Sequence, residues 1–262
     1  MIVVGDNLQI THPMVHAALR DSNPDPLKAL VRRMEAAGAR MIDINTGPLG
    51  KGAEEKMTFL VRAVEAATEL PLLIDTANPD AMAAGVRAAH GRVILNGFSL
   101  EPRKLKHILP LAPQYDADII GYLLDARGRT LPTVDDRLAL AVELHQACLT
   151  EKVPQERLII DPVVTPLLWE DGRTQNRAVL RVVQALPEVL GYDVRTVAGL
   201  SNLTAGTKFS DKQAAMECAY GAMLAASGLD MVLLNVFHEK TVRVAGACEA
   251  LLSEKVFTWE TG

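Results

Sequence analysis

Met41-Ile42-Asp43-Ile44-Asn45 is a short apolar run that ends in a polar residue, and five further runs of this kind recur along the chain. Four consecutive aliphatic residues are typical of a strand that is buried on both faces. Asp and Asn are disfavoured in strands, so their place at the carboxyl ends of these runs needs a structural reason. The other runs are Leu72-Leu73-Ile74-Asp75, Val93-Ile94-Leu95-Asn96, Leu158-Ile159-Ile160-Asp161, Val197-Ala198-Gly199-Leu200-Ser201-Asn202 and Met231-Val232-Leu233-Leu234-Asn235.

A closed parallel barrel supplies this reason, because all its strands point their carboxyl ends at one mouth, where the active sites of such barrels lie. Helical segments separate the runs and give eight strand-then-helix units, which is typical of a parallel sheet. The sequence therefore predicts an α/β fold, a single (β/α)8 TIM barrel. We expect strands at residues 2–4, 41–44, 72–74, 93–95, 119–124, 158–160, 197–200 and 231–234, and helices at about 25–38, 53–70, 79–90, 101–112 (broken at Pro110), 134–150, 177–190, 211–228 and 239–255.

A doubly wound sheet is the alternative architecture, and it would normally carry a glycine-rich phosphate turn after its first strand. Gly5-Asp6-Asn7-Leu8 follows the first predicted strand and is not such a turn. We expect Gly5-Asp6-Asn7 to form a loop, and Asp25 to cap the first helix ahead of Pro26. The longest strand-to-helix loops follow the first, sixth and seventh strands, so substrate contacts are expected there.

Length and composition agree with one barrel. The 262 residues are close to the ~250 typical of this fold, and no linker divides them, so residues 1–262 are predicted to form a single domain. The net charge of −5, without a basic block, argues against nucleic acid as a partner. No signal peptide or membrane span is expected. Cys148, Cys218 and Cys248 lie in predicted helices as reduced core residues, which indicates a cytoplasmic protein.

Asp75, Asn96 and Asp161 suggest what the mouth could bind. A carboxylate accepts hydrogen bonds, and an amide both donates and accepts. The edge of a pterin presents N–H donors at its 2-amino group and N3 beside a carbonyl acceptor, which two carboxylates and one amide would match. Capping of the next helix is the alternative for any one such residue, as Asn78 before Pro79 illustrates. Capping does not, however, require the polar residue to follow the last apolar one directly.

Other chemistries have little support in the sequence. No predicted strand carries a lysine for Schiff-base catalysis, and phosphate-loop and nucleophile-elbow motifs are absent. His12 and His16 are four residues apart but lack a partner cysteine or an intervening glutamate, so no metal site is predicted. His238 follows the last strand, where a helix-starting or solvated role is expected rather than one in the mouth.

Several motifs, in order and spacing, resemble the pterin-binding methyltransferases over essentially the whole chain. The similarity is greatest to the methyltetrahydrofolate:corrinoid protein methyltransferases, which include the acetogen enzyme acting on the corrinoid iron–sulfur protein. The folate-binding domain of cobalamin-dependent methionine synthase is also similar. The motifs are Asp43-Ile44-Asn45-Thr46-Gly47-Pro48, Ile74-Asp75-Thr76, Asn96, Ile160-Asp161-Pro162 and Gly199-Leu200-Ser201-Asn202.

The resemblance implies methyl transfer, in either direction, between N5 of tetrahydrofolate and the cobalt of a separate corrinoid protein, in acetogenesis or anaerobic demethylation. It also implies a homodimer that binds no metal directly. Asn202 would be catalytic and lie beside N5, strengthening its hydrogen bond as the transition state forms. The residues that would bind or line the pterin site are Asp75, Asn96, Asp161, Asp43, Asn45, Gly199, Ser201 and Asn235.

The chain departs from the related sequences at two places. It has Gly5-Asp6-Asn7-Leu8-Gln9 where they often have Gly-Glu-Arg-(Ile/Thr)-Asn, and Leu203-Thr204-Ala205-Gly206 where they continue with Val-Ser and a larger residue. The second change suggests adaptation to another corrinoid partner, such as one in the demethylation of methoxy or methylamine-type donors. The D-x-H-x-x-G signature of corrinoid domains is absent, so cobalamin is expected to be carried by the partner.

Two alternatives remain open. A dihydropteroate synthase would share the barrel and the pterin pocket, but its Asn-Val-Thr-Pro-Asp-Ser-Phe-type loop and a basic pair near the last strand are not seen here. A non-catalytic pterin- or folate-binding subunit is the second alternative. Four charged residues are candidates for the anionic folate tail, with ordinary solvated loop charges as the other interpretation: Lys51, Arg127, Arg129 and Lys208.

Overall fold

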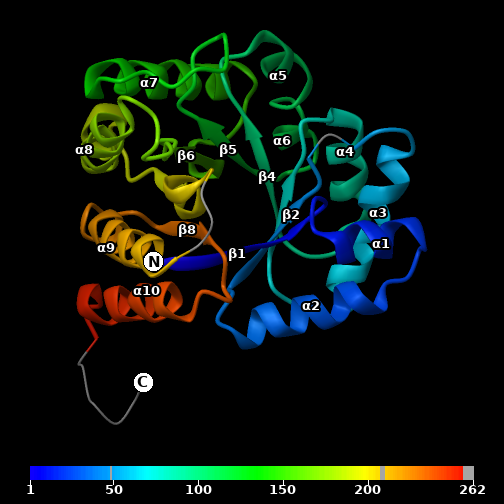
Figure 1. Cartoon of the computed structure of the whole chain (residues 1–262). Helices are drawn as coiled ribbons and strands as arrows, with labels where there is room; N and C mark the ends of the chain where they lie inside the picture. The colour runs from blue at the N-terminus through cyan, green and yellow to red at the C-terminus, as the bar shows by residue number, and fades with distance from the viewer. Residues whose placement is uncertain (48, 207–209, 256–262) are drawn as a thin grey trace.

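The eight strands form a closed parallel barrel in the order β1 to β8, and the predicted (β/α)8 fold is confirmed (Figure 1). The structure, a computed structural model, describes residues 1–47, 49–206 and 210–255. The strands are β1 (Ile2–Gln9), β2 (Met41–Asn45), β3 (Leu72–Asp75), β4 (Val93–Phe98), β5 (Asp118–Tyr122), β6 (Leu158–Asp161), β7 (Arg195–Gly199) and β8 (Met231–Leu234).

Helices surround the barrel on its outside (Figure 1). The predicted break at Pro110 is confirmed, because two short helices, α5 and α6, replace one. The helices are α1 (Pro13–Arg20), α2 (Asp25–Ala36), α3 (Ala53–Glu65), α4 (Pro79–Ala88), α5 (Pro102–His107), α6 (Leu111–Gln114), α7 (Val134–Thr150), α8 (Gly172–Leu190), α9 (Asp211–Ala226) and α10 (Glu239–Leu252), with 3₁₀ turns η1 (Gln155–Arg157) and η2 (Leu200–Thr204).

The prediction of a loop directly after the first strand was wrong. Gly5-Asp6-Asn7 lies within β1, which pairs with β2 on both sides of a register shift between Gly5 and Leu8. A bulge of this kind lets a strand continue while it changes direction. Helix α1 was also missed; the side chain of His12 caps it by accepting from the backbone N–H of Met14.

Two helix starts differ from the prediction. Asp25 is the first residue of α2 rather than its cap, a position held by Pro24. Helix α8 begins at Gly172, five residues before its expected start, and Asn78 caps α4 as expected. Among the described residues, no helix combines the length and apolar character that a membrane crossing requires. Cys148 and Cys248 are buried as predicted, whereas Cys218 is only half-buried.

The apolar core forms an inner and an outer layer. The outer layer fills the space between the strands and the helices. The inner layer lies inside the barrel, with one aliphatic or thioether side chain from seven of the strands. These residues are Val4, Leu73, Ile94, Ile120, Ile159, Val197 and Met231, and they close the barrel interior below its mouth.

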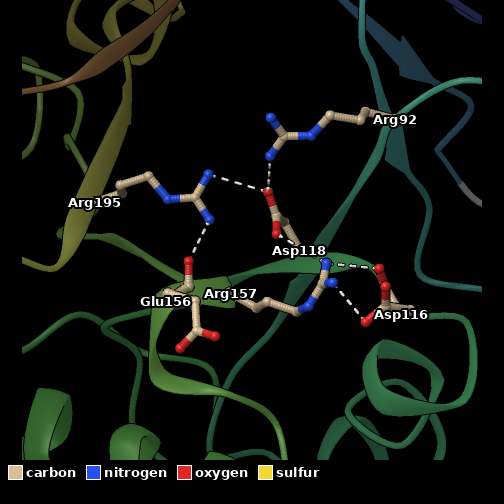
Figure 2. A network of polar contacts seen from close by, with 6 residues as sticks. All are labelled: Arg92, Asp116, Asp118, Glu156, Arg157 and Arg195. Atoms are coloured by element: carbon tan, nitrogen blue, oxygen red, sulfur yellow. Dashed lines mark hydrogen bonds and ion pairs between the residues drawn. The ribbon is translucent and has the colours of Figure 1, made fainter.

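The opposite, amino-terminal end of the barrel is held together by one buried carboxylate (Figure 2). Asp118, at the start of β5, lies within 2.9 Å of Arg92, 3.0 Å of Arg195 and 3.5 Å of Arg157, each distance joining a carboxylate oxygen to a guanidinium nitrogen. Arg157 also pairs with Asp116. The arginines come from different elements, so the carboxylate ties them together, and this end of such barrels serves stability rather than chemistry.

Candidate functional site at the barrel mouth

Strand periodicity explains how the polar residues come together. Side chains two residues apart along a strand point to the same face. Asp75 follows the inner-layer residue Leu73 by two positions, and Asp161 follows Ile159 in the same way. In most strands, the residue two positions after the inner-layer residue lies in a second, polar layer nearer the mouth. By this register the polar layer contains Asp6, Asp43, Asp75, Asn96, Tyr122 and Asp161.

Asp75 is joined to the neighbouring strand by an amide. Asn45 Nδ2 donates to Asp75 Oδ2 over 2.6 Å, and the two residues are direct partners in the β2–β3 pairing. Burial raises the pKa of Asp75 to about 6, against the opposing influence of Lys104 and the Asn45 hydrogen bond. Asn45 and Asp75 thus form one hydrogen-bonded unit at the carboxyl ends of β2 and β3.

Asp43 holds an unused acceptor. Its side chain is 1% exposed, and its Oδ1 has no hydrogen-bond partner among the described residues. Burial, and then the charges of Asp75 and Asp6, raise the pKa of Asp43 well above its ordinary value, while a hydrogen bond from Asn96 acts in the opposite direction. Buried polar atoms are normally paired, so this oxygen marks a position for a donor.

Asn96 is fixed on two sides. The hydroxyl of Tyr122 donates to Asn96 Oδ1 over 2.5 Å, and the Asn96 amide contacts Asp43. The next residue, Gly97, approaches β5 so closely that an added Cβ would lie 2.3 Å from the carbonyl oxygen of Ile120. Only glycine therefore allows β4 to present Asn96 at this depth.

Asp161 is fixed by its own loop. The backbone N–H of Val163 donates to Asp161 Oδ1 over 2.7 Å, and burial raises the pKa of Asp161 to about 7. The fully buried Arg137 of α7 donates to the carbonyl oxygens of Pro162 and Val163, and to Gln175 Oε1 of α8 over 2.7 Å. Two outer helices thereby hold the loop that carries this carboxylate.

Asn202 stands at the rim. It lies in η2, directly after β7, and its side chain is exposed. An added Cβ on Gly199 would lie 3.0 Å from Asn202 Nδ2, so glycine leaves room for the amide to fold back over the end of the strand. Ser201 Oγ donates to Asp6 Oδ2 over 2.8 Å. Ser201 thus meets the polar layer from the β7 side, with Gly199 and Asn202 next to it in the chain.

Asn235 is engaged mainly in loop structure. Its Oδ1 accepts from Asn7 Nδ2 over 2.6 Å and from the backbone N–H of Phe237 over 3.0 Å. Its amide lies 3.2 Å from His238 Nε2, and His238 holds the cap position of α10, which confirms the expected helix-starting role. Of the predicted residues, Asn235 therefore has the least hydrogen-bonding capacity left for a ligand.

Sequence reasoning missed four residues of this region: Asp6, Tyr122, Lys104 and Arg137. Tyr122 could have been found from the period of β5, since it follows the inward-facing Ile120 by two positions. Lys104 Nζ lies 5.4 Å from the centre of the Tyr122 ring and pairs with Glu101 over 2.9 Å. Nothing in the sequence distinguishes Lys104 or Arg137 from ordinary helix charges.

The rim cations differ in their surroundings. Lys51 and Arg127 are exposed, whereas Arg129 pairs with Asp125 over 2.8 Å. Lys208 lies outside the described residues, as does Pro48 of the Asp43–Pro48 motif. Within the described part of the chain, no group of three or more His, Cys, Asp and Glu side chains is arranged to hold a metal ion.

The mouth thus gathers carboxylates, amides and one phenol around a buried, partly unsatisfied acceptor. Such a set suits a flat heterocycle that is rich in N–H donors, because ionised acceptors form the stronger hydrogen bonds. The raised pKa values of Asp75 and Asp161 also allow these groups to hold a proton near neutral pH.

Comparisons with known proteins give the family. The sequence model of the family described as pterin binding enzyme matches residues 13–235. The methylcorrinoid:tetrahydrofolate methyltransferase of Eubacterium limosum is 25% identical over 212 residues, which cover 79% of this chain and 75% of that protein. The methionine synthase of Mycobacterium tuberculosis is 20% identical over 67% of this chain but only 15% of its own length.

A solved structure supports the fold alone. Dihydropteroate synthase of Xanthomonas albilineans, in complex with indole-2-carboxylic acid and 6-chloroguanine, superposes with a TM-score of 0.68. The superposition covers 97% of this chain and 94% of that one, at 19% identity.

Proposed function

The chain belongs to the pterin-binding enzymes, and from that premise we propose that it transfers a methyl group between N5 of tetrahydrofolate and the cobalt of a corrinoid held by a separate protein. The observation that supports the proposal is that Asp75, Asn96 and Asp161 lie in the carboxyl-terminal parts of β3, β4 and β6, at the same mouth of the barrel at which η2 carries the exposed Asn202. The similarity to a protein named as a methylcorrinoid:tetrahydrofolate methyltransferase supports it.

The residues present fit a pterin. Asp75 and Asp161 would accept hydrogen bonds from the 2-amino group and N3–H of the ring, and Asp43 Oδ1 supplies the unused buried acceptor described above. Asn45, Gly199, Ser201 and Asn235 would line the pocket around them. A corrinoid held by the partner would supply the cobalt chemistry of methyl exchange, which the residues of the mouth do not offer.

Asn202 would act on the transition state. In the direction that demethylates N5, the methyl group leaves readily only when N5 gains a proton, which water would supply, so an N5–H donor develops as the C–N bond breaks. The amide oxygen of Asn202 would accept this developing donor more strongly than it contacts the methylated substrate. An interaction that strengthens in the transition state raises the rate, whereas one of constant strength improves only binding.

The two alternatives make different predictions. A dihydropteroate synthase-like enzyme would join a pterin to an aromatic amine without any corrinoid, and a binding subunit would hold folate without turnover. The Eubacterium limosum relative is named with methylcorrinoid as donor and tetrahydrofolate as acceptor, so that direction comes first in the test. The same residues would serve the reverse direction.

The test is an absorbance assay of cobalamin. The protein is mixed with methylcobalamin and tetrahydrofolate, and separately with cob(I)alamin and methyltetrahydrofolate, with folate binding measured by calorimetry. Conversion in either mixture is expected. Tight folate binding without conversion, even with corrinoid proteins added, would favour the binding subunit. Absence of folate binding would remove the proposal.

We further propose a homodimer, a single domain over residues 1–262 and a reducing, cytoplasmic location, the last from the three unpaired cysteines. A groove of about 520 Å³ between α8 and α9 carries the exposed Met216 and Met223 beside Arg173 and Arg177, and would offer a mixed apolar and charged surface to a second copy. The run at residues 81–89 lies largely buried against the molecule and offers none. Sedimentation of wild-type protein and of Met216→Lys would test the dimer.

A further inference from the structure

Two buried carboxylates hold the residues on either side of Asn202. Ser201 Oγ donates to Asp6 Oδ2 over 2.8 Å, and Thr204 Oγ1 donates to Glu217 Oε1 over 2.5 Å. Asp6 belongs to β1 and Glu217 to α9, so the two contacts fix the β7 loop, residues 200–206, to separate elements. Asp6 is 7% exposed and Glu217 is 4% exposed.

Among the described residues, Asn202 is held by its neighbours in the chain. Its side chain is exposed, and the close approach to Gly199 limits it on one side. The direction of its amide is therefore determined by the backbone of the β7 loop. That backbone is attached at Ser201 and Thr204, one residue before Asn202 and two residues after it.

The two attachments belong to one polar cluster. Glu217 Oε2 lies 3.6 Å from His238 Nδ1, and His238 Nε2 lies 3.2 Å from the amide of Asn235. Asn235 in turn bonds Asn7, the residue after Asp6. The cluster thus connects the loop ends of β1, β7 and β8 through side chains rather than backbone pairing.

The cluster also unites the two departures noted in the sequence. Residues 5–9 contribute Asp6 and Asn7, and residues 203–206 contribute Thr204. The two segments in which the chain departs from the related sequences therefore lie in the same cluster of side chains. Charge-assisted hydrogen bonds are short and strong, which suits two carboxylates that must hold a loop in one position.

We propose that Asp6 and Glu217 are positioning residues that hold the β7 loop from both sides and so place the amide of Asn202 for the methyl transfer proposed above, on which the kinetic part of this inference rests. Both residues act through their hydroxyl partners. Neither is required to contact the substrate or to exchange a proton with it.

The experiment compares Thr204→Val and Asp6→Ala with a matched control. Thr196 Oγ1 donates to Asp230 Oδ2 over 2.9 Å at the opposite end of the same β7 strand, so Thr196→Val removes a similar contact far from Asn202. Loss of a hydrogen bond to a charged group should lower kcat by roughly 10- to 100-fold in Thr204→Val and Asp6→Ala. In Thr204→Val, folate Kd is expected to stay within about twofold, and Thr196→Val should keep the wild-type kcat.

Hydrogen exchange provides a readout that is independent of turnover. Backbone amides of residues 200–206 should exchange faster in Thr204→Val and Asp6→Ala than in wild-type protein or Thr196→Val. If the wild-type protein transfers no methyl group, the proposed function fails, but the exchange data still decide whether the loop is held as described.

Two results would overturn the inference. One is unchanged exchange at 200–206 in both variants. The other is a loss of kcat in Thr204→Val that merely equals the loss in Thr196→Val after correction for folded fraction. In a double-mutant cycle, Thr204→Val with Glu217→Gln should be less harmful than the sum of the single changes, whereas additive losses would show that the two side chains act separately.

Discussion

The hydroxyl of Tyr122 lies 2.5 Å from Asn96 Oδ1 and joins the carboxyl ends of β4 and β5. Asn96 is thereby oriented on its carbonyl side by Tyr122 and on its amide side by Asp43. Burial, and then the charges of Asp75, Asp161 and Asp43, raise the pKa of Tyr122 well above its ordinary value. The phenol therefore stays protonated and remains a donor to Asn96.

Tyr122→Phe tests this orientation. The change removes one donor from a buried amide oxygen while keeping the ring beneath Lys104. We expect folate affinity to fall by roughly 5- to 150-fold, because an unsatisfied buried acceptor costs about 1–3 kcal/mol. Calorimetry measures the change, and Tyr115→Phe, whose hydroxyl contacts the exposed Arg87, is the control. Equal affinities for the two variants would contradict the role given to Tyr122.

The pH dependence of folate binding follows from two carboxyl groups. Burial raises the pKa of Asp75 to about 6 and that of Asp161 to about 7. Ring N–H donors favour the ionised forms, so the affinity should rise with pH from about 5 to 8 and then level off, with proton release on binding at pH 6. Calorimetry in buffers of different ionisation enthalpy measures the released protons. Proton uptake would contradict the carboxylate assignment.

The stability of the ligand-free protein should depend on pH in the opposite direction from folate affinity, falling as the pH rises. Both groups have folded-state pKa values above those of an unfolded chain, so the folded state binds more protons in this range. Their contribution to stability is greatest below about pH 4 and is lost as the pH rises through about 6 to 7. Asp75→Asn should therefore flatten this part of the profile of unfolding free energy against pH, and an unchanged profile would exclude Asp75 as its source.

Arg137→Met tests how the β6 loop is held. The guanidinium is fully buried and donates to Pro162, Val163 and Gln175, so its loss leaves several acceptors without a donor. We expect a loss of about 1–3 kcal/mol of unfolding free energy for each buried acceptor left unpaired, together with weaker folate binding through misplacement of Asp161.

Arg129→Met provides the comparison for Arg137→Met. Its pair with Asp125 is largely exposed at the arginine, so a loss of no more than about 1 kcal/mol is expected. Urea unfolding measures both variants. Comparable losses of unfolding free energy in the two variants would mean that the buried network does not hold the β6 loop. Unchanged folate affinity in folded Arg137→Met would mean that the position of this loop does not affect folate binding.

The barrel was predictable because its signal is periodic. Short aliphatic runs with polar ends repeat at regular intervals, and the strand period then determines which side chains face the mouth, so Asp75, Asn96 and Asp161 could be grouped without a structure. Asp6 could not be placed, because a bulge keeps Gly5-Asp6-Asn7 in β1 where the composition predicts a loop. Arg137 and Glu217 were missed since their roles depend on contacts with residues far away in the sequence.

Asn202→Ala tests the catalytic role itself. The exposed amide lies at the rim, so its removal leaves the buried acceptors Asp75 and Asp161 in place and should change folate Kd by no more than about threefold. If Asn202 stabilises the developing N5–H only in the transition state, kcat should fall by roughly 10²- to 10³-fold, the usual cost of one preorganised partner. Asp161→Ala should weaken folate binding more than it lowers kcat, because the Asp161 carboxylate would bind the substrate and the transition state equally. Stopped-flow absorbance gives kcat and calorimetry gives Kd for both variants. Wild-type turnover in Asn202→Ala would exclude the amide from the chemical step and leave the carboxylates and their partners as the source of catalysis.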